Sequence, residues 1–331
     1  MNQPDVLKDK TMLVTGGTGT FGHKFVEMVL THHQPTALRI YSRGEKLQHD
    51  MSMQFDDSRL RFLIGDVRDK NRLTRAMDDV DIVVHAAALK QVPACEFNPI
   101  EAVRTNIEGA VNIIDASLDC GVQKVMAIST DKAVYPVCLY GATKMAAEKL
   151  FVHANAYAGG KDTCFSCVRY GNVIGSRGSV IPLFLQQKEK GVLTITDTRM
   201  TRFWICIDDG VGFVIKAIGM MKGGEIFVPR IPSMKVTELA EAIAPSAEKR
   251  VTGIRPGERL HETLLTEEEA RRSVRMQDGF IIEPESMVRK GIHMHQGERL
   301  PDGFCYRSDL NEEWLNRKDA LHMINGDGID A

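Results

Sequence analysis

The sequence lacks the features of several protein classes. It has no excess of basic residues, because 42 Lys and Arg residues are balanced by 44 Asp and Glu residues. Proteins that bind nucleic acids or anionic membranes usually carry such an excess. No apolar run approaches the roughly 20 residues of a membrane span, and the start MNQPDVLKDK has no apolar stretch of the signal-peptide type. The seven cysteines are scattered and odd in number, which is typical of reduced thiols. We therefore expect a cytoplasmic protein that binds neither nucleic acid nor a membrane.

A complete set of metal ligands is also missing from the sequence. Cys164 and Cys167 lie within one strand-like run, so we expect packed thiols rather than a metal site. The histidine pairs at 32–33 and 293/295 have no further ligands at a suitable spacing. We expect no bound metal.

Short apolar runs alternate with helix-length segments of mixed polarity through the first half of the chain. The runs read TMLVTG, LRIYS, LRFLIGD, DIVVHAAA, KVMAIST and CFSCVRYGN. This alternation is typical of βαβ units, in which helices cover both faces of a parallel sheet. We predict an α/β fold with a doubly wound parallel sheet.

The pattern loosens after about residue 175. We predict a nucleotide-binding domain over 1–175, to which segments at about 203–230 return. A smaller C-terminal substrate-binding domain, mainly a lid, is predicted over 176–285. Residues 286–331 are polar with few apolar anchors and are predicted to form a tail.

A glycine-rich segment follows the first apolar run directly. In TGGTGTFG, at 15–22, Gly16, Gly19 and Gly22 form a G-x-x-G-x-x-G motif that is followed by the amphipathic segment HKFVEMVL. Glycines at a tight strand-to-helix turn let backbone N–H groups approach a pyrophosphate, which the helix N-terminus also favours. Because strand, glycines and helix occur in this order, we predict a Rossmann-like dinucleotide site. Its contacts are assigned to Gly16, Thr18, Gly19, Thr20, Phe21 and Gly22.

The end of the second apolar run indicates which dinucleotide binds. NAD binders usually have a carboxylate there for the ribose hydroxyls, whereas this chain has YSRGEK. Ser42, Arg43 and Lys46 offer a hydroxyl and two cations, which suit a 2′-phosphate and favour NADP. The alternative is a solvated basic turn, and Glu45 tempers the charge.

Two further segments are expected to border the cofactor. Asp66, followed by Val67 in GDVRD, is placed to hydrogen-bond the adenine edge, or else caps a helix. In HAAALK, at 85–90, small residues such as Ala86 allow close approach, although they are also ordinary packing. Lys90 follows the carboxyl end of a strand, where ligands bind in open α/β sheets, and could contact cofactor or substrate.

The stretch STDKAVYPVCLYGATK, at 129–144, contains a Tyr-x-x-x-Lys pair. Tyr140 and Lys144 lie one helical turn apart, so the ammonium can lower the pKa of the phenol from about 10. A phenol with a lowered pKa can act as a base toward a sugar hydroxyl while hydride passes to a nicotinamide. Asp131 and Lys132 stand directly upstream of this pair.

Long blocks of the chain resemble a known family. The chain is similar to extended short-chain dehydrogenases/reductases, and among them to the inverting UDP-N-acetylglucosamine 4,6-dehydratases that open pseudaminic acid biosynthesis. The resemblance runs to about Glu283 through TGGTGTFG, HAAALKQVP, STDKA, LYGATK, VRYGNVIGSRGSV, RMTRFWI, GGEIFVPRIPSMK and GIRPGERLHE. Related retaining dehydratases have Asp-Glu after the Thr, whereas Asp131-Lys132 here marks the inverting branch.

The resemblance implies a closed redox cycle with NADP on UDP-N-acetylglucosamine. Tyr140 would take the proton of the 4-hydroxyl while hydride leaves C4. Lys132 would then remove the C5 hydrogen as a neutral amine. This requires a lowered pKa, which burial near other cations would give. Asp131 would protonate the departing 6-hydroxyl, and Thr130 would orient the substrate or Tyr140, or else cap its strand. Hydride would return to C6 and a proton would reach C5 from the opposite face, giving UDP-2-acetamido-2,6-dideoxy-L-arabino-hexos-4-ulose.

The resemblance also implies residues that bind the substrate. Guanidinium groups suit the two phosphates through paired donors, although each of these charges could instead be solvated. The substrate candidates are Lys90, Asn172, Val173, Arg177, Arg202, Arg255 and Glu258. The family tends to form homo-oligomers.

Three other readings stay open. The segment AVYPVC departs from the family pattern, and its Tyr135-Pro136 step is similar to that of capsule-sugar dehydratases that epimerise C5, although these usually carry Met in place of Tyr140. A nucleotide-sugar 4-epimerase would use Tyr140 and Lys144 without the Asp131-Lys132 pair. A non-catalytic NADP-binding regulator would need the glycine turn but neither pair.

Overall fold

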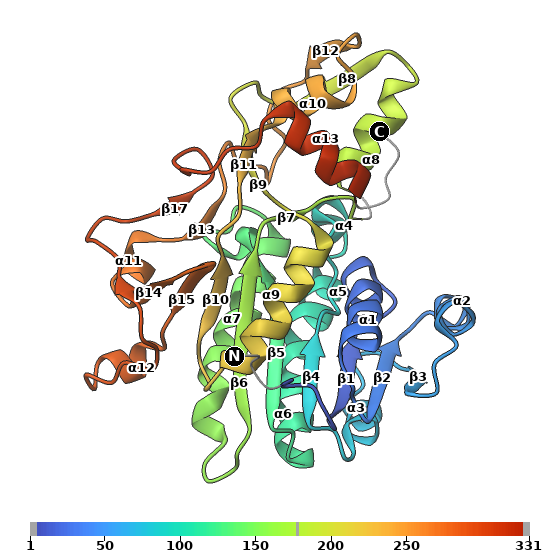
Figure 1. Cartoon of the computed structure of the whole chain (residues 1–331), viewed down its shortest axis with the longest axis vertical. Helices are drawn as coiled ribbons and strands as arrows, with labels where there is room; N and C mark the ends of the chain where they lie inside the picture. The colour runs from blue at the N-terminus through green and yellow to red at the C-terminus, as the bar shows by residue number, and fades with distance from the viewer. Residues whose placement is uncertain (1–4, 177–178, 327–331) are drawn as a thin grey trace.

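The computed structural model describes residues 5–176 and 179–326. Its centre is a ten-stranded sheet with the order β16-β14-β15-β10-β6-β5-β4-β1-β2-β3 (Figure 1). The strands are β1 (Thr11–Thr15), β2 (Ala37–Ser42), β3 (Leu60–Ile64), β4 (Ile82–His85), β5 (Lys124–Thr130), β6 (Cys164–Tyr170), β10 (Ile226–Pro229), β14 (Ser273–Met276), β15 (Gly279–Ile282) and β16 (Glu298–Arg299).

The strands from β3 to β10 in this order all run parallel. The order reverses beside β1, which pairs with both β2 and β4, and such a reversal opens a ligand crevice at the carboxyl ends of the strands. The predicted doubly wound α/β fold is therefore confirmed. Strands β15, β14 and β16 extend one edge in antiparallel pairing, which the sequence pattern did not predict.

Helices cover both faces of the large sheet. Helix α1 packs against α9, whereas α6 packs against α3 and α7, and Figure 1 shows these two groups on opposite sides of the sheet. The helices of this part are α1 (Thr20–His32), α2 (Glu45–Phe55), α3 (Lys70–Met77), α4 (Val92–Phe97), α5 (Pro99–Val103), α6 (Gly109–Cys120), α7 (Leu139–Ala154) and α9 (Ile207–Met220), with a π-helical turn η1 (Arg104–Glu108) between α5 and α6 and 3₁₀ turns η2 (Asp131–Ala133) and η3 (Asn155–Tyr157).

A smaller part lies beyond the carboxyl ends of the parallel strands, in the upper half of Figure 1. It has its own apolar cluster, which includes Phe184, Trp204, Met234 and Ile324. Its elements are β7 (Asn172–Val173), α8 (Val180–Lys188), β8 (Val192–Ile195), β9 (Thr201–Ile205), β11 (Ser233–Lys235), α10 (Val236–Ile243), β12 (Glu248–Val251) and α13 (Arg317–Gly326). The remaining elements are β13 (Thr263–Leu265), α11 (Glu267–Ala270), α12 (Glu285–Val288) and β17 (Tyr306–Arg307).

The division into domains at 175 and 285 stays a prediction, but some segments lie elsewhere than expected. Strands β14 and β15 belong to the large sheet, although 176–285 was predicted to be mainly a lid. The predicted tail contributes β16 to the same sheet and packs α13 against α10. The sequence understates the contacts of the tail because this segment carries few apolar anchors.

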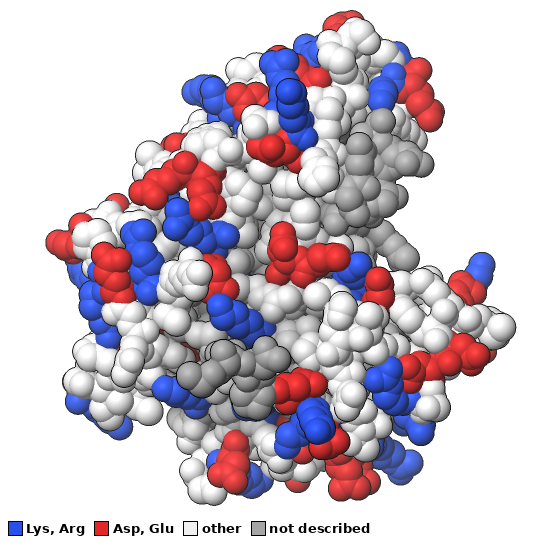
Figure 2. Space-filling model, viewed as in Figure 1, with Lys and Arg blue, Asp and Glu red and all other residues white. Residues whose placement is uncertain are grey.

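The surface shows no segregation of charge on the face in Figure 2, where Lys and Arg alternate with Asp and Glu. Within residues 5–176 and 179–326, no helix is long and apolar enough to cross a membrane. Cys164 and Cys167 lie in β6, and Cys167 is fully buried in the core. Among the described residues no group of three His, Cys, Asp or Glu side chains is placed to hold a metal ion.

A buried ion network connects the large sheet to the segment after β13. Arg169, which is 2% exposed, donates to Glu148 on α7 through Nε at 3.0 Å and to Glu269 on α11 through both terminal nitrogens. Ser129 on β5 donates to the same Glu148 carboxylate at 2.6 Å. The network therefore fixes the position of α7 relative to β5.

Removing the central cation should be costly. We expect Arg169→Ala to lower the free energy of unfolding by about 3–5 kcal/mol, because two carboxylates would stay buried without their cation. Urea unfolding measures this change. Arg271→Ala is the control, since the Arg271–Glu268 pair is solvent-exposed and such pairs contribute about 0–1 kcal/mol. Equal losses in the two variants would contradict the assigned role.

Candidate active site

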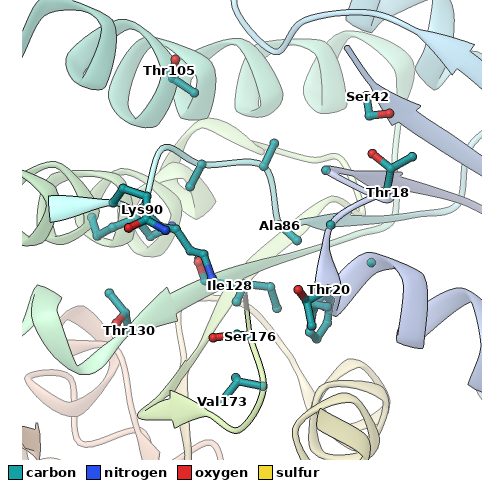
Figure 3. A pocket seen from close by; sticks show the side chains of 18 of the residues that line it. Thr18, Thr20, Ser42, Ala86, Lys90, Thr105, Ile128, Thr130, Val173 and Ser176 are labelled. Carbon is teal, nitrogen blue, oxygen red and sulfur yellow. The ribbon is translucent and has the colours of Figure 1, made fainter. Parts of the chain in front are cut away.

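A cavity of about 710 Å³ lies at the carboxyl ends of β1, β4, β5 and β6. Figure 3 shows Thr18 and Ser42 on one side of this first cavity and Lys90 and Thr130 on the other, with Val173 and Ser176 along its wall. The lining residues come from segments far apart in the sequence, because parallel strands bring their carboxyl ends to one edge.

The glycine turn between β1 and α1 is tightly packed. Gly16 has φ +67°, and a Cβ at this position would lie 2.8 Å from the backbone nitrogen of Ala87. A Cβ on Gly22 would lie 2.4 Å from Gly17 Cα, so α1 can approach the turn here because its residue is glycine. No side chain caps the N-terminus of α1, whose N-cap is Gly19. The first N–H groups of the helix thus meet the cavity as an anion site.

Most predicted cofactor contacts line this first cavity. They are Gly16, Thr18, Gly19, Thr20, Phe21, Gly22, Ser42, Arg43, Asp66, Val67, Ala86, Lys90, Tyr140 and Lys144. Lys46 is an exception, since it lies exposed in the first turn of α2 and is not among the lining residues. Helix α2 begins one residue earlier than this lysine and turns it away from the strand end.

Arg43 and Asp66 border one end of the first cavity. The Arg43 guanidinium is 61% exposed and lies 3.9 Å from Asp66 Oδ2. Asp66 accepts from the backbone and the guanidinium of Arg68, so it does not cap α3, whose N-cap is Asp69. The pKa of Asp66 is lowered, because the hydrogen bonds from Arg68 outweigh its burial. Asp66 therefore presents a charged carboxylate at the rim.

Thr105 is a lining residue that sequence motifs did not reveal. It lies in η1, is 6% exposed, and its Oγ1 has no hydrogen-bond partner within the described parts of the chain. A buried hydroxyl without a partner is costly. Together with the glycine turn, this hydroxyl fits a bound dinucleotide. No motif marks Thr105, because its position depends on the π-helical turn.

Tyr140 and Lys144 project from α7 into the first cavity and are both buried. Lys144 Nζ donates to the carbonyl of Ile128 at 2.7 Å, and burial lowers its pKa. The expected lowering of the phenol pKa is not found, since burial raises the pKa of Tyr140 to about 12 despite the opposing effects of Lys132 and Thr130. The Lys132 charge opposes this rise, while the Lys144 ammonium in this structure donates to a backbone carbonyl.

Asp131 and Lys132 lie in η2, between β5 and α7. Asp131 is fully buried, and its Oδ1 accepts from Lys132 Nζ at 2.9 Å and from Thr130 Oγ1 at 2.9 Å. Lys132 Nζ also donates to Asn172 Oδ1 at 3.3 Å. Thr130 in addition accepts from the Lys132 backbone at 3.4 Å, as the N-cap of the turn. The pair is thus held rigidly beside Tyr140.

The pKa of Lys132 departs from the expectation of a lowered value. Burial lowers it, but the carboxylates of Asp131 and Glu262 raise it by more, so the pKa lies above the ordinary lysine value. The expected lowering relied on nearby cations, whereas the carboxyl groups of Asp131 and Glu262 face this ammonium. Glu262 itself belongs to GIRPGERLHE but was not among the predicted site residues.

A second cavity, of about 620 Å³, adjoins the first, and Lys132, Asn172 and Ser179 line both. Its other walls include Arg202, Arg255 and Glu258. Val173 and Lys90 line the first cavity instead, and Arg177 lies outside the described residues.

The predicted phosphate-binding arginines differ in their availability. Arg202 is 11% exposed and donates to the backbone carbonyls of Thr201, Arg259 and Leu260. Arg255 is 57% exposed, and its guanidinium lies 3.9 Å from Glu258. Arg202 thus organises the chain around 259–260, whereas Arg255 is accessible to a ligand in the second cavity.

Comparison with known proteins places this site in a family. The family model described as polysaccharide biosynthesis protein matches residues 12–284. The chain belongs to this family. One relative, the UDP-N-acetylglucosamine 4,6-dehydratase (inverting) of Campylobacter jejuni subsp. jejuni serotype O:23/36 (strain 81-176), is 49% identical over 325 residues, covering 96% of this chain and 97% of the relative. The resemblance seen in the sequence blocks is thereby confirmed.

Other members of this broad group have different activities in their names. The UDP-glucose 4-epimerase of Rickettsia conorii (strain ATCC VR-613 / Malish 7) is 42% identical over 282 residues, covering 83% of each chain. Among solved structures, the X-ray structure of Pen from Bacillus thuringiensis matches with a TM-score of 0.88 at 36% identity, covering 97% of this chain and 99% of that one. The fold is therefore shared along nearly the whole chain.

Proposed function

We propose that this protein is an NADP-dependent UDP-N-acetylglucosamine 4,6-dehydratase that inverts C5, a hydro-lyase of the first step of pseudaminic acid biosynthesis. The observation that carries the proposal is the Asp131–Lys132 ion pair: its aspartate is fully buried, and its half-buried lysine lines both cavities. A 49% identical relative named as the inverting dehydratase supports it. The cytoplasmic location and homo-oligomeric assembly expected from the sequence stay predictions.

The first cavity would hold the dinucleotide. The glycine turn and the uncapped N-terminus of α1 suit its pyrophosphate, and Ser42 with Arg43 suits a 2′-phosphate, which favours NADP. When bound, the dinucleotide would supply the hydride chemistry between C4 and C6 of the sugar. The second cavity would take the uridine diphosphate, with Arg255 and Glu258 as its polar contacts.

The side chains of this site would then divide the proton transfers. Tyr140 takes the proton of the 4-hydroxyl, and the cations Lys132 and Lys144 stabilise the phenolate. The resulting 4-keto group acidifies C5, from which Lys132 removes a proton after its own ammonium proton has passed to Asp131. Asp131 donates a proton to the 6-hydroxyl, which leaves as water. A proton that reaches C5 from the opposite face completes the inversion.

A 4-epimerase is the second candidate, because a relative at 42% identity bears that name. It would use Tyr140 and Lys144 in the same way. It would not use the Asp131–Lys132 pair, however, and its product would keep the oxygen at C6. The dehydratase assigns a step to every one of these four side chains.

Incubation with UDP-N-acetylglucosamine in deuterated water tests the proposal. We expect a product that has lost one water, carries deuterium at C5, and shows inverted C5 configuration by NMR. An unchanged mass with a C4 epimer would establish the epimerase instead. Loss of water with retained C5 configuration would reject the inversion.

The choice of NADP predicts the effect of Arg43→Ala. Removing this guanidinium should weaken NADP binding about 10–100-fold, the value of a charge-assisted hydrogen bond, and leave NAD binding nearly unchanged. Calorimetric titration with each dinucleotide measures both affinities. Lys46→Ala is a matched control, since it removes a cation of the same turn that does not line the cavity. Equal weakening of NAD and NADP in Arg43→Ala would contradict a 2′-phosphate contact.

A further inference from the structure

Glu262 is a buried carboxyl group on the wall of the second cavity. It precedes β13 and is 3% exposed. Its Oε1 lies 3.7 Å from Lys132 Nζ and 3.8 Å from Arg202 Nε, whereas charge-assisted hydrogen bonds are about 2.7–2.9 Å long. Its Oε2 has no hydrogen-bond partner within residues 5–176 and 179–326. Glu262 therefore lacks the short hydrogen bonds that stabilise a buried carboxylate.

The backbone holds this side chain in place. The Glu262 N–H donates to Ser308 Oγ at 3.0 Å, and the Ser308 N–H donates to the Glu262 carbonyl at 2.8 Å. Ser308 Oγ is in turn 2.7 Å from Thr201 Oγ1 on β9. The distance between Glu262 and the Asp131–Lys132 pair is thus set by the fold and not by a mobile loop.

Charged groups face Glu262 from three segments. Lys132 and Asp131 belong to η2, Arg202 to β9, and Arg259 to the chain just before Glu262. Burial and the Asp131 carboxylate raise the pKa of Glu262, and the three cations oppose this effect without cancelling it. The protonated form is therefore favoured at a pH at which an exposed glutamate is ionised.

The protonation of Glu262 decides how many anions face Lys132. With Glu262 ionised, the Lys132 ammonium lies between two carboxylates, and its proton stays on nitrogen. With Glu262 neutral, Asp131 Oδ1 is the carboxylate that faces Nζ, at 2.9 Å. A proton can then pass from Nζ to Oδ1, which leaves a neutral amine and a carboxylic acid. These are the two forms that elimination across C5 and C6 requires.

We propose that Glu262 is a positioning residue for the Asp131–Lys132 pair: its neutral carboxyl group allows Lys132 to lose its proton to Asp131. The inference rests on the proposed function and deepens it. Its proton balance is closed. The amine gains the C5 proton, the acid gives its proton to the 6-hydroxyl, water leaves, and the pair returns to carboxylate and ammonium.

The pH dependence of turnover tests this role. In the wild type, kcat should fall on the alkaline side as Glu262 ionises, by about tenfold per pH unit for one proton. In Glu262→Gln the side chain is uncharged at every pH, so this limb should disappear while KM for UDP-N-acetylglucosamine changes little. Glu262→Asp should keep a limb at a shifted pH. An unchanged limb in Glu262→Gln, or a loss of kcat at all pH values, would overturn the inference.

Glu225→Gln is the matched control for a buried glutamate. Glu225 is fully buried beside β6 and accepts from Ser166 and His295, outside both cavities. We expect a lower melting temperature and an unchanged pH profile of kcat. A purely structural role of Glu262 would give the same result in Glu262→Gln.

A readout without substrate separates this inference from the proposed function. Infrared difference spectra of wild type against Glu262→Gln should contain the carbonyl band of a protonated carboxylic acid at neutral pH, and this band should vanish on alkaline titration. Absence of the band would contradict the inference, whichever substrate the protein converts. A titrating band in a wild-type protein that does not dehydrate UDP-N-acetylglucosamine overturns the proposed function alone.

Discussion

Lys132→Ala is expected to lower the rate of water loss from UDP-N-acetylglucosamine by about 10²–10⁴-fold, the contribution of a general base. In the first step, proton loss from the 4-hydroxyl, Tyr140 is the base and Lys132 contributes only its charge, so this step should be slowed but not abolished. A single turnover should therefore still change the nicotinamide absorbance while no 4-keto-6-deoxy product accumulates. The variant separates elimination from oxidation.

The same variant distinguishes the two candidate enzymes. A 4-epimerase would keep its activity, because it needs Tyr140 and Lys144 but no base at C5. Mass spectrometry of the product and the absorbance trace measure both steps. Lys149→Ala is the control, since Lys149 is exposed on the same helix α7. Dehydration at the wild-type rate in Lys132→Ala would remove the main support for the proposed function.

Tyr140→Phe is expected to reduce turnover by a similar factor of about 10²–10⁴ but to block an earlier step. Without the phenol nothing takes the proton of the 4-hydroxyl, so the nicotinamide absorbance should not change. Affinity for both ligands should be nearly unaffected, because one hydroxyl is lost from a buried ring. The contrast with Lys132→Ala places the two side chains at different steps.

The pH profile adds a second criterion for Tyr140. Burial raises the pKa of this phenol to about 12 in the protein alone, so its proton must be drawn off by neighbouring cations and the bound cofactor. Measured by absorbance, the pKa of Tyr140 should fall when NADP binds. Tyr157→Phe is the control, because Tyr157 is 75% exposed. Wild-type turnover in Tyr140→Phe would reject this residue as the base.

The sequence predicted those parts of the site that local rules govern. A strand, a glycine turn and a helix in that order must bring N–H groups to a pyrophosphate, and the structure places Gly16, Gly19 and Gly22 on the first cavity. Tyr140 and Lys144 follow from helical spacing. Lys46 was assigned as a cation that follows the second strand, but it lies in the first turn of α2 and is not among the residues that line the cavity.

Contacts between distant segments could not be predicted in this way. Glu262 lies 130 positions after Lys132, and their atoms are 3.7 Å apart. Arg202 looked available for phosphate, yet three backbone carbonyls engage it. Thr105 reaches the cavity through a π-helical turn without a sequence signal.

The sequence by itself determined the doubly wound fold, the dinucleotide turn and the identities of the Tyr140–Lys144 and Asp131–Lys132 pairs, because each depends on residues close together in the chain. The tertiary structure decided the charge state of these groups. Burial raises the pKa of Tyr140, and the two carboxylates around Lys132 raise its pKa where cations had been expected to lower it. Electrostatic energies depend on distance and burial in space, and residue order alone specifies neither.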